Sequence, residues 1–291
     1  MDFLFLWSFL FNCAIILVIM KYRELFKYAR DNNQIIDFEE EAIYFLIEEI
    51  NHLKRHEIIL KMNDDLDNED ILMEKVNRYI KDNIPVQYLL NTAYFYGNKF
   101  YVNEDVLIPR FDTEILVDKS IELIGSKKCR IVDIGTGSGI IAISIKLKCE
   151  NAIVDAIDIS PVALDVAKKN AHDLNADINF IENDMLESID TKYDFIISNP
   201  PYIDNSEYVS DIVRSNEPSL ALFSEDKGMY HYKKIIQSSL NNLNDDVVLI
   251  FEIPDNKCDA LVEYASMYYQ DIEYIKDYNN QRRVLIIKKR K

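Results

Sequence analysis

The sequence predicts a doubly wound α/β domain, preceded by a small helical domain and a hairpin linker. Three observations support this prediction. Beyond Asp112, apolar runs of strand length alternate with helical patterns, which is typical of a parallel sheet. A cluster of glycines follows the first of these runs, whereas residues 22–83 show helical periodicity instead. At 291 residues the chain is long enough for more than one domain.

The first twenty residues form an apolar leader. Residues 3–20 are apolar apart from two polar side chains, and the basic Lys21, Arg23 and Lys27 follow. Such a stretch is just long enough to span a bilayer, and its basic flank would keep the rest of the chain on the cytoplasmic side. A cleaved secretory signal fits less well, because no charged region precedes it and no small-residue cleavage site follows. A misplaced start is the other interpretation, since a chain beginning at Met20 would look ordinary, and both interpretations stay open.

Residues 21–90 are expected to form the helical domain. Four apolar residues share one helical face, with charges elsewhere, namely Ile43, Leu46, Ile47 and Ile50. Short aromatic segments at 94–97 and 100–102 then predict a hairpin, so residues 91–111 are assigned to a linker and residues 112–291 to the sheet domain.

Within the sheet domain the apolar runs locate the strands. They are expected at 129–134, 152–158, 178–181, 194–198 and 247–253, followed by a terminal pair near 271–277 and 283–289. In a doubly wound sheet the first and fourth of these strands should flank the point at which the strand order reverses. The segments that follow these two strands would then lie side by side, at the carboxyl edge of the sheet.

Composition excludes several classes of function. The chain has 50 acidic and 33 basic residues and a net charge of −17, which disfavours nucleic acid as a partner. Its four cysteines are scattered without a Cys-x-x-Cys pair, which fits a reducing cytosol and argues against zinc. His52 and His56 are four residues apart in a charged helical stretch, but no third ligand is evident. No metal site is therefore predicted.

The glycine cluster predicts a ligand-binding loop between a strand and a helix. The chain holds six glycines, and three of them lie within the segment Asp133, Ile134, Gly135, Thr136, Gly137, Ser138 and Gly139. Glycine lets the backbone come close to a ligand. A dinucleotide fingerprint would require a sixth-position glycine, where this chain has Ile140. The spacing suits S-adenosylmethionine, which has no pyrophosphate to hold.

An acidic residue follows the next expected strand. Asp158 lies 25 residues after Asp133, near the offset of about 20 at which an acid meets ribose hydroxyls. Helix capping would also explain an aspartate here, but Ser160 and Pro161 already provide a cap and a first turn.

The segment Asn199, Pro200, Pro201 and Tyr202 ends the fourth expected strand and predicts the acceptor site. It suits methylation of a planar nitrogen, whose N–H groups must be held by acceptors in line with a methyl donor. Asn199 offers a side-chain oxygen, Pro200 a backbone carbonyl aimed by its fixed φ, and Tyr202 a ring to lie against the substrate. An ordinary turn could also use Asn-Pro. The glycine loop favours the methyl-transfer interpretation.

Together with segments 85–89, 107–114 and 217–222, these motifs resemble the peptide chain release factor glutamine methyltransferase family over about residues 21–288. The resemblance implies a class I methyltransferase fold with an antiparallel terminal strand, and S-adenosylmethionine as donor. It also implies methylation of the side-chain amide of the glutamine in the Gly-Gly-Gln motif of class 1 release factors. The chain departs from the residues usual in this family at Asn91, Phe111, Pro254 and Lys257. The apolar leader is also outside the family pattern.

The resemblance assigns roles to particular residues. It implies that the donor is bound by Gly135 to Gly139, Asp158, the pair Asp184 and Met185, and Asn199, while Asn199 to Tyr202 hold the glutamine. The main rival is an adenine-N6 methyltransferase, because an exocyclic adenine amine is also planar. Base flipping there would require a basic groove and a target-recognition region, and neither is evident. A cytoplasmic protein is expected, tethered to the membrane only if residues 3–20 form an anchor.

Overall fold

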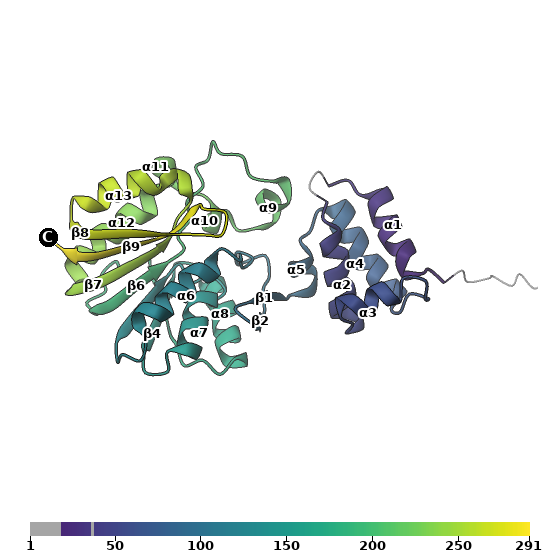
Figure 1. Ribbon diagram of the computed structural model, residues 1–291, viewed down its shortest axis with the longest axis horizontal. Coiled ribbons are helices and arrows are strands. Elements are labelled where there is room, and N and C mark those ends of the chain that lie inside the picture. Colours follow the sequence, from purple (N-terminus) through teal and green to yellow (C-terminus); the bar gives the residue numbers. More distant parts are fainter. Residues whose placement is uncertain (1–18, 36–37) are drawn as a thin grey trace, which may run out of the picture. The chain divides into compact units, whose positions relative to one another are not determined.

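The computed structural model describes residues 19–35 and 38–291, and the chain divides into two compact units between Val86 and Gln87 (Figure 1). The leader expected at residues 1–20 lies almost wholly outside the described residues. Among the residues that are described, no helix is both long and apolar enough to cross a membrane.

The first unit is helical, as predicted. Its helices are α1 (Tyr22–Asn32), α2 (Glu40–Asn51), α3 (Arg55–Leu60) and α4 (Glu69–Asp82). Ile43, Leu46 and Ile47 are buried on one face of α2, while Ile50 is half-buried. The expectation that His52 and His56 share one helical stretch is wrong, because His52 ends α2 in the left-handed conformation, with φ 53°.

The predicted hairpin is present and belongs to the second unit. After α5 (Val86–Leu90), strands β1 (Ala93–Phe95) and β2 (Asn98–Phe100) pair antiparallel. Tyr96 and Gly97 form the turn with positive φ values of 49° and 75°, as a two-residue hairpin turn requires. Phe95 and Phe100 are buried in the same apolar cluster as the sheet. The segment assigned to a linker therefore packs as part of the sheet domain.

A seven-stranded sheet forms the centre of the second unit. Its spatial order is β5-β4-β3-β6-β7-β9-β8, with β3 to β7 parallel, and with β8 and β9 antiparallel to their neighbours. The strands are β3 (Arg130–Ile134), β4 (Ile153–Asp158), β5 (Asn179–Glu182), β6 (Tyr193–Ser198), β7 (Leu243–Glu252), β8 (Tyr269–Lys276) and β9 (Arg282–Arg290). This confirms the predicted doubly wound sheet with an antiparallel terminal strand.

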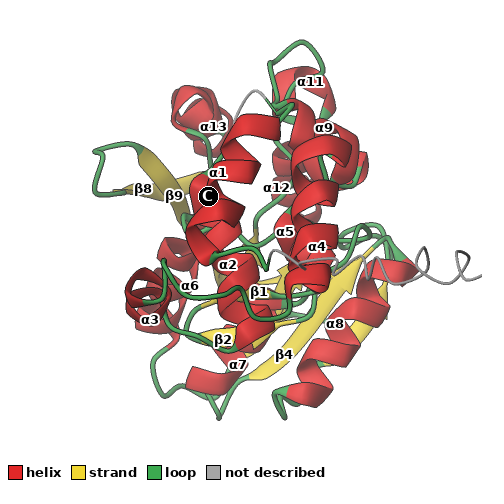
Figure 2. Cartoon of the chain, turned by 90° about the vertical axis from the view of Figure 1, so that its right-hand side faces the viewer, coloured by secondary structure: helices red, strands yellow, loops and turns green. Residues whose placement is uncertain are grey.

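Helices bury both faces of the sheet. Figure 2 shows α7 and α8 beside β4, and the apolar cluster on their side of the sheet also includes α6. A second cluster packs α12 and α13 against the other face. The bounds are α6 (Thr113–Ile124), α7 (Ile140–Lys148), α8 (Pro161–Asp173), α9 (Asp211–Asn216), α10 (Ser219–Leu222), α11 (Glu225–Gly228), α12 (Tyr230–Asn242) and α13 (Cys258–Ser266), with a short 3₁₀ helix at Asp255–Lys257.

The strand order reverses between β3 and β6, where ligands bind in open α/β sheets. Ile134 pairs with Ser198 in the parallel ladder. The next residues along the chain, Gly135 and Asn199, therefore leave the sheet side by side. The predicted neighbourhood of the glycine loop and Asn199 is confirmed.

Candidate active site

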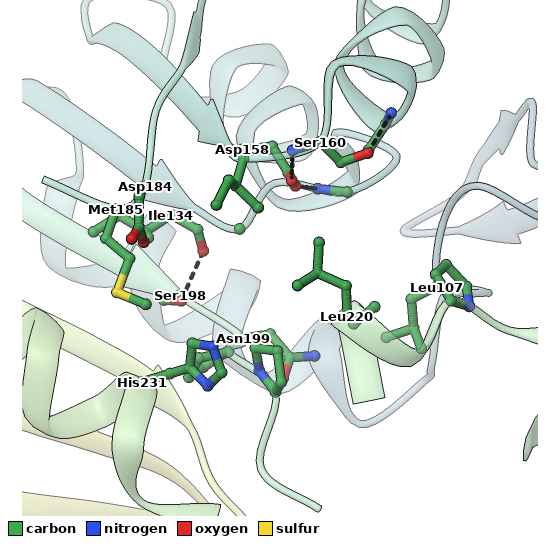
Figure 3. Close-up of a pocket in the computed structure, with 18 of the residues that line it drawn as sticks. Leu107, Ile134, Asp158, Ser160, Asp184, Met185, Ser198, Asn199, Leu220 and His231 are labelled. Carbon is green, nitrogen blue, oxygen red and sulfur yellow. Dashed lines mark hydrogen bonds between the residues drawn. The ribbon is translucent and has the colours of Figure 1, made fainter. Parts of the chain in front are cut away.

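A cavity of about 320 Å³ opens at this carboxyl edge (Figure 3). Figure 3 shows Asp158 and Ser160 across the open space from Asn199 and His231, with Asp184 and Met185 at one end and Leu107 and Leu220 at the other. The sheet-edge residues that line it are Ile134, Gly135, Gly137, Asp158, Ile159, Ser160, Ala163, Asn183, Asp184, Met185, Ser198, Asn199, Pro200 and Pro201. The cavity therefore brings the two predicted motifs together.

The glycine loop is held to the end of β4 by backbone hydrogen bonds. The N–H groups of Gly135 and Thr136 donate to the Ile157 carbonyl at 2.8 and 3.0 Å. A Cβ built on Gly135 or Gly137 would meet no protein atom within 4 Å, although both residues line the cavity. Side chains there would take up ligand space. Gly139 serves packing instead, because its Cβ would lie 2.9 Å from Ile143 Cδ1.

Asp133 lies behind the loop, away from the cavity wall. Its Oδ2 accepts hydrogen bonds from Thr136 Oγ1 at 2.6 Å and from the Ala142 N–H at 3.3 Å. Complete burial raises the pKa of Asp133 to about 7, although these two hydrogen bonds act in the opposite direction. Asp133 therefore supports the shape of the loop from beneath.

Asp158 ends β4 and faces the cavity. Its two carboxylate oxygens accept backbone hydrogen bonds from Ser160 at 2.9 Å and from Gly137 at 2.8 Å. Burial raises its pKa, while these bonds oppose the shift. Each carboxylate oxygen has two lone pairs, so Asp158 keeps acceptor capacity for ligand hydroxyls. Ser160 caps α8, its hydroxyl accepting from the Ala163 N–H at 3.3 Å, as the sequence predicted.

Asn199 stands at the end of β6. Its Nδ2 donates to Thr113 Oγ1 at 3.3 Å, and the preceding Ser198 hydroxyl donates to the Ile134 carbonyl at 2.7 Å. Pro200 and Pro201 also line the cavity. Tyr202 does not line it, because its ring packs against the apolar cluster beneath, where burial raises its pKa to about 12.

Asp184 and Met185 follow β5 at the far end of the cavity. Met185 has a positive φ of 55° and lines the cavity. Asp184 forms an ion pair with Lys234 of α12. The ion pair therefore joins the segment after β5 to α12, and both of these contribute residues to the cavity wall.

Of the site residues predicted from sequence, those on the cavity wall are Gly135, Gly137, Asp158, Asp184, Met185, Asn199, Pro200 and Pro201. The others adjoin it without lining it, namely Asp133, Thr136, Ser138, Gly139 and Tyr202.

Two remote segments complete the wall, and the sequence did not place them there. They comprise residues 105–107 and residues 218, 220 and 221. Glu217, whose side chain is 1% exposed, joins them by accepting from the Ile108 N–H at 3.2 Å and from Arg110 Nη2 at 2.5 Å. Leu107 and residues 218, 220 and 221 belong to motifs that carried the family resemblance, and that was the signal available.

His231 is a further cavity residue that sequence reasoning missed, since it lies in a polar helical stretch without a recognisable motif. Its Nδ1 lies 2.7 Å from Ser224 Oγ, and its ring also hydrogen-bonds the Pro201 backbone. Burial lowers its pKa. His231 therefore supports the Pro200–Pro201 turn as a neutral ring at neutral pH.

Comparisons with known proteins agree with this geometry. The methyltransferase small domain family matches residues 111–220. A release factor glutamine methyltransferase of Flavobacterium psychrophilum is 39% identical over 85% of this chain and 91% of its own. One of Enterococcus faecalis is 37% identical over 91% and 98%. The crystal structure of a methyltransferase from Pyrococcus furiosus shares the fold, with a TM-score of 0.51, 17% identity, and coverage of 67% of this chain and 90% of that one.

Proposed function

Since the chain belongs to the release factor glutamine methyltransferase family, we propose that it methylates the glutamine of the Gly-Gly-Gln motif in class 1 peptide chain release factors. The methyl group goes from S-adenosylmethionine to the side-chain amide nitrogen. The observation that carries the proposal is the pairing of Ile134 with Ser198, because it delivers the glycine loop and Asn199 to one cavity.

The donor side of the cavity fits S-adenosylmethionine. Gly135 and Gly137 leave space that any side chain would fill, and Asp158 offers carboxylate lone pairs to ribose hydroxyls. Asp184 and Met185 would flank the base at the far end. When bound, S-adenosylmethionine supplies an electrophilic methyl group on its sulfonium.

The acceptor side holds the glutamine amide. An amide nitrogen is a poor nucleophile because its lone pair is delocalised, so orientation must supply much of the rate. The side-chain oxygen of Asn199 and the carbonyl of Pro200 accept the two amide hydrogens and aim the nitrogen at the methyl group. Pro201 continues the rigid turn, and His231 supports it by bonding the Pro201 backbone. Stacking of Tyr202 on the amide stays a prediction. The Tyr202 ring packs against an apolar cluster and does not line the cavity, so stacking would require the ring to turn toward the amide.

Adenine is not the favoured acceptor. The curated relatives are named for glutamine methylation, and a net charge of −17 repels a nucleic acid backbone. A release factor as substrate also supports a cytoplasmic activity that acts on the machinery of translation termination.

Mass spectrometry of release factor peptides tests the proposal. Incubation with the protein and S-adenosylmethionine should add one methyl group to the tryptic peptide that contains Gly-Gly-Gln, and fragmentation should locate it on the glutamine. A release factor with glutamate in place of that glutamine is the matched control and should stay unmodified. An unmodified glutamine, together with methylated adenine in added DNA or RNA, would contradict the proposal.

A further inference from the structure

A buried carboxyl group lies directly behind Asn199. Glu252 ends β7, and the register pairs Phe251 with Ser198, so Glu252 is beside Asn199 at the sheet edge. The residue is 4% exposed. Among the described residues no lysine or arginine forms an ion pair with it, and its Oε2 has no hydrogen-bond partner there. Because burying an unpaired carboxylate is costly, this arrangement calls for a reason other than stability.

The polar neighbours of Glu252 point to that reason. Hydrogen bonding to Thr113 and to Asn199 stabilises its ionised form. Asn199 Nδ2 also donates to Thr113 Oγ1 at 3.3 Å. Thr113 is the first residue of α6 and is 1% exposed, so Thr113 and Glu252 form a buried polar pair that meets the part-buried Asn199 at the cavity wall.

The ionised carboxylate sets the direction of each bond in this group. It has no hydrogen to donate, so Thr113 gives its hydroxyl hydrogen to Glu252 and keeps lone pairs for Asn199. Asn199 Nδ2 donates one hydrogen to Thr113 Oγ1, and its second hydrogen is then available for the Glu252 carboxylate. Its Oδ1 is left for the cavity.

We propose that Glu252 is a positioning residue that, with Thr113, holds the amide of Asn199 so that its oxygen faces the acceptor glutamine. The inference rests on the proposed function for the identity of the acceptor. It adds a reason why Asn199 presents its oxygen, since an amide rotated by half a turn would present a donor and repel the substrate N–H groups.

Protonation of Glu252 would remove this control. Burial, followed by the charge of Asp112, raises its pKa, while Thr113, Arg283 and Asn199 lower it, and the outcome is about 7. A protonated carboxyl group can donate to Asn199 Oδ1, which favours the wrong orientation. The rate of methyl transfer should therefore be low below this pKa and rise as the pH increases through it.

Other titrating groups face the same region. Arg283 of β9 stays charged because its pKa is raised, and Asp112 precedes α6. Burial raises the pKa values of Tyr202 and of Tyr232 on α12, so both phenols are neutral near pH 7. Asp133 also has a pKa of about 7. Because it supports the glycine loop, its titration should change donor binding, and rates measured at saturating donor exclude a change in donor binding.

The test is single-turnover methylation of a release factor at saturating donor, from about pH 6 to about pH 9. Glu252→Gln keeps the shape and removes the charge. At high pH its rate should fall between about 10-fold and about 100-fold, as expected for a misplaced reacting group, and the rise near pH 7 should disappear. Donor affinity measured by calorimetry should stay at the parental value.

Variants of Thr113 provide the second measurement. Thr113→Val lacks the hydroxyl and should lower the rate as Glu252→Gln does, whereas Thr113→Ser keeps the hydroxyl and should retain most of the rate. The double variant with Glu252→Gln and Thr113→Val should be no slower than either single variant, because the two side chains act as one unit. If Glu252→Gln fails to fold, the Thr113 pair decides.

Asp155→Asn is a matched control, because Asp155 is another buried strand carboxylate, paired with Arg130 outside the cavity. It should lose stability and keep the pH profile. A parental rate and pH profile in Glu252→Gln, or equal losses in Thr113→Ser and Thr113→Val, would overturn the inference while the proposed function stands. A parent protein that methylates no release factor would overturn both.

Discussion

The proposed donor half of the cavity is formed by the glycine loop and Asp158, and the proposed acceptor half by Asn199 to Pro201. These two halves are built in different ways. On the donor half, backbone N–H groups of the glycine loop bond to Ile157 and Asp158, about twenty residues further along the chain. On the acceptor half, side chains make the bonds, and Asn199 meets Thr113 across 86 positions in sequence. The donor half is therefore a local backbone shape, whereas the acceptor half depends on distant side chains. Variants in the first should affect binding, and variants in the second should affect the chemical step.

Gly137→Val should have the largest effect. Gly137 has φ 54°, a conformation that β-branched residues avoid, and the new side chain would point into the cavity. We expect no measurable donor binding by calorimetry, and hence no methylation. Gly97→Val is the matched control, because Gly97 has φ 75° and open space but lies in the hairpin turn. It should cost about 1 to 3 kcal/mol of stability and keep donor binding. Parental donor affinity in a folded Gly137→Val variant would contradict the prediction.

Asn199→Ala should have the next largest effect. It removes one of the two acceptors for the glutamine amide and leaves the glycine loop and Asp158 in place. Under saturating donor the single-turnover rate should fall by about 100-fold or more, while a large part of the donor affinity survives. Methyl transfer close to the parental rate would show that Asn199 does not hold the acceptor.

Glu217→Gln should weaken the contact between the two remote segments of the cavity wall without unfolding the protein. The buried carboxylate holds Ile108 and Arg110 against the segment after residue 216. Loss of its charge should lower the free energy of unfolding by about 1 to 3 kcal/mol, measured by denaturant titration. Lys168→Ala breaks an exposed ion pair on α8 and should leave stability unchanged. Equal stability losses in the two variants would contradict a stabilising role of the Glu217 carboxylate.

A chain that begins at Met20 should show the smallest effect. Both halves of the cavity lie in the second unit, and truncation keeps the bonds that anchor α1. These are Met20 N to Glu69 Oε2 at 3.0 Å and Leu66 N to the Met20 carbonyl at 2.7 Å. Release factor methylation and the melting temperature should match those of the full chain. Aggregation or inactivity of the truncated chain, with an active full chain in detergent, would show that the leader is integral.

Local patterns in the sequence determined the elements of this protein. Apolar periodicity located every strand of the sheet to within a few residues, and glycine spacing located the loop between β3 and α7. These features could be predicted because strand formation, turn conformation and helix capping depend mainly on neighbouring residues. The position of Asn199 beside the glycine loop also followed, because strand order in doubly wound sheets obeys general rules.

Only the tertiary structure decided which side chains meet. Glu252 lies behind Asn199 because β7 pairs with β6 in one register, and a shift of one residue would turn it to the opposite face. His231 reaches the cavity from a segment whose local sequence carries no sign of it, while the Tyr202 ring packs in an apolar cluster and does not line the cavity. Such meetings depend on packing between residues distant in sequence, and periodicity within one segment contains no information about them.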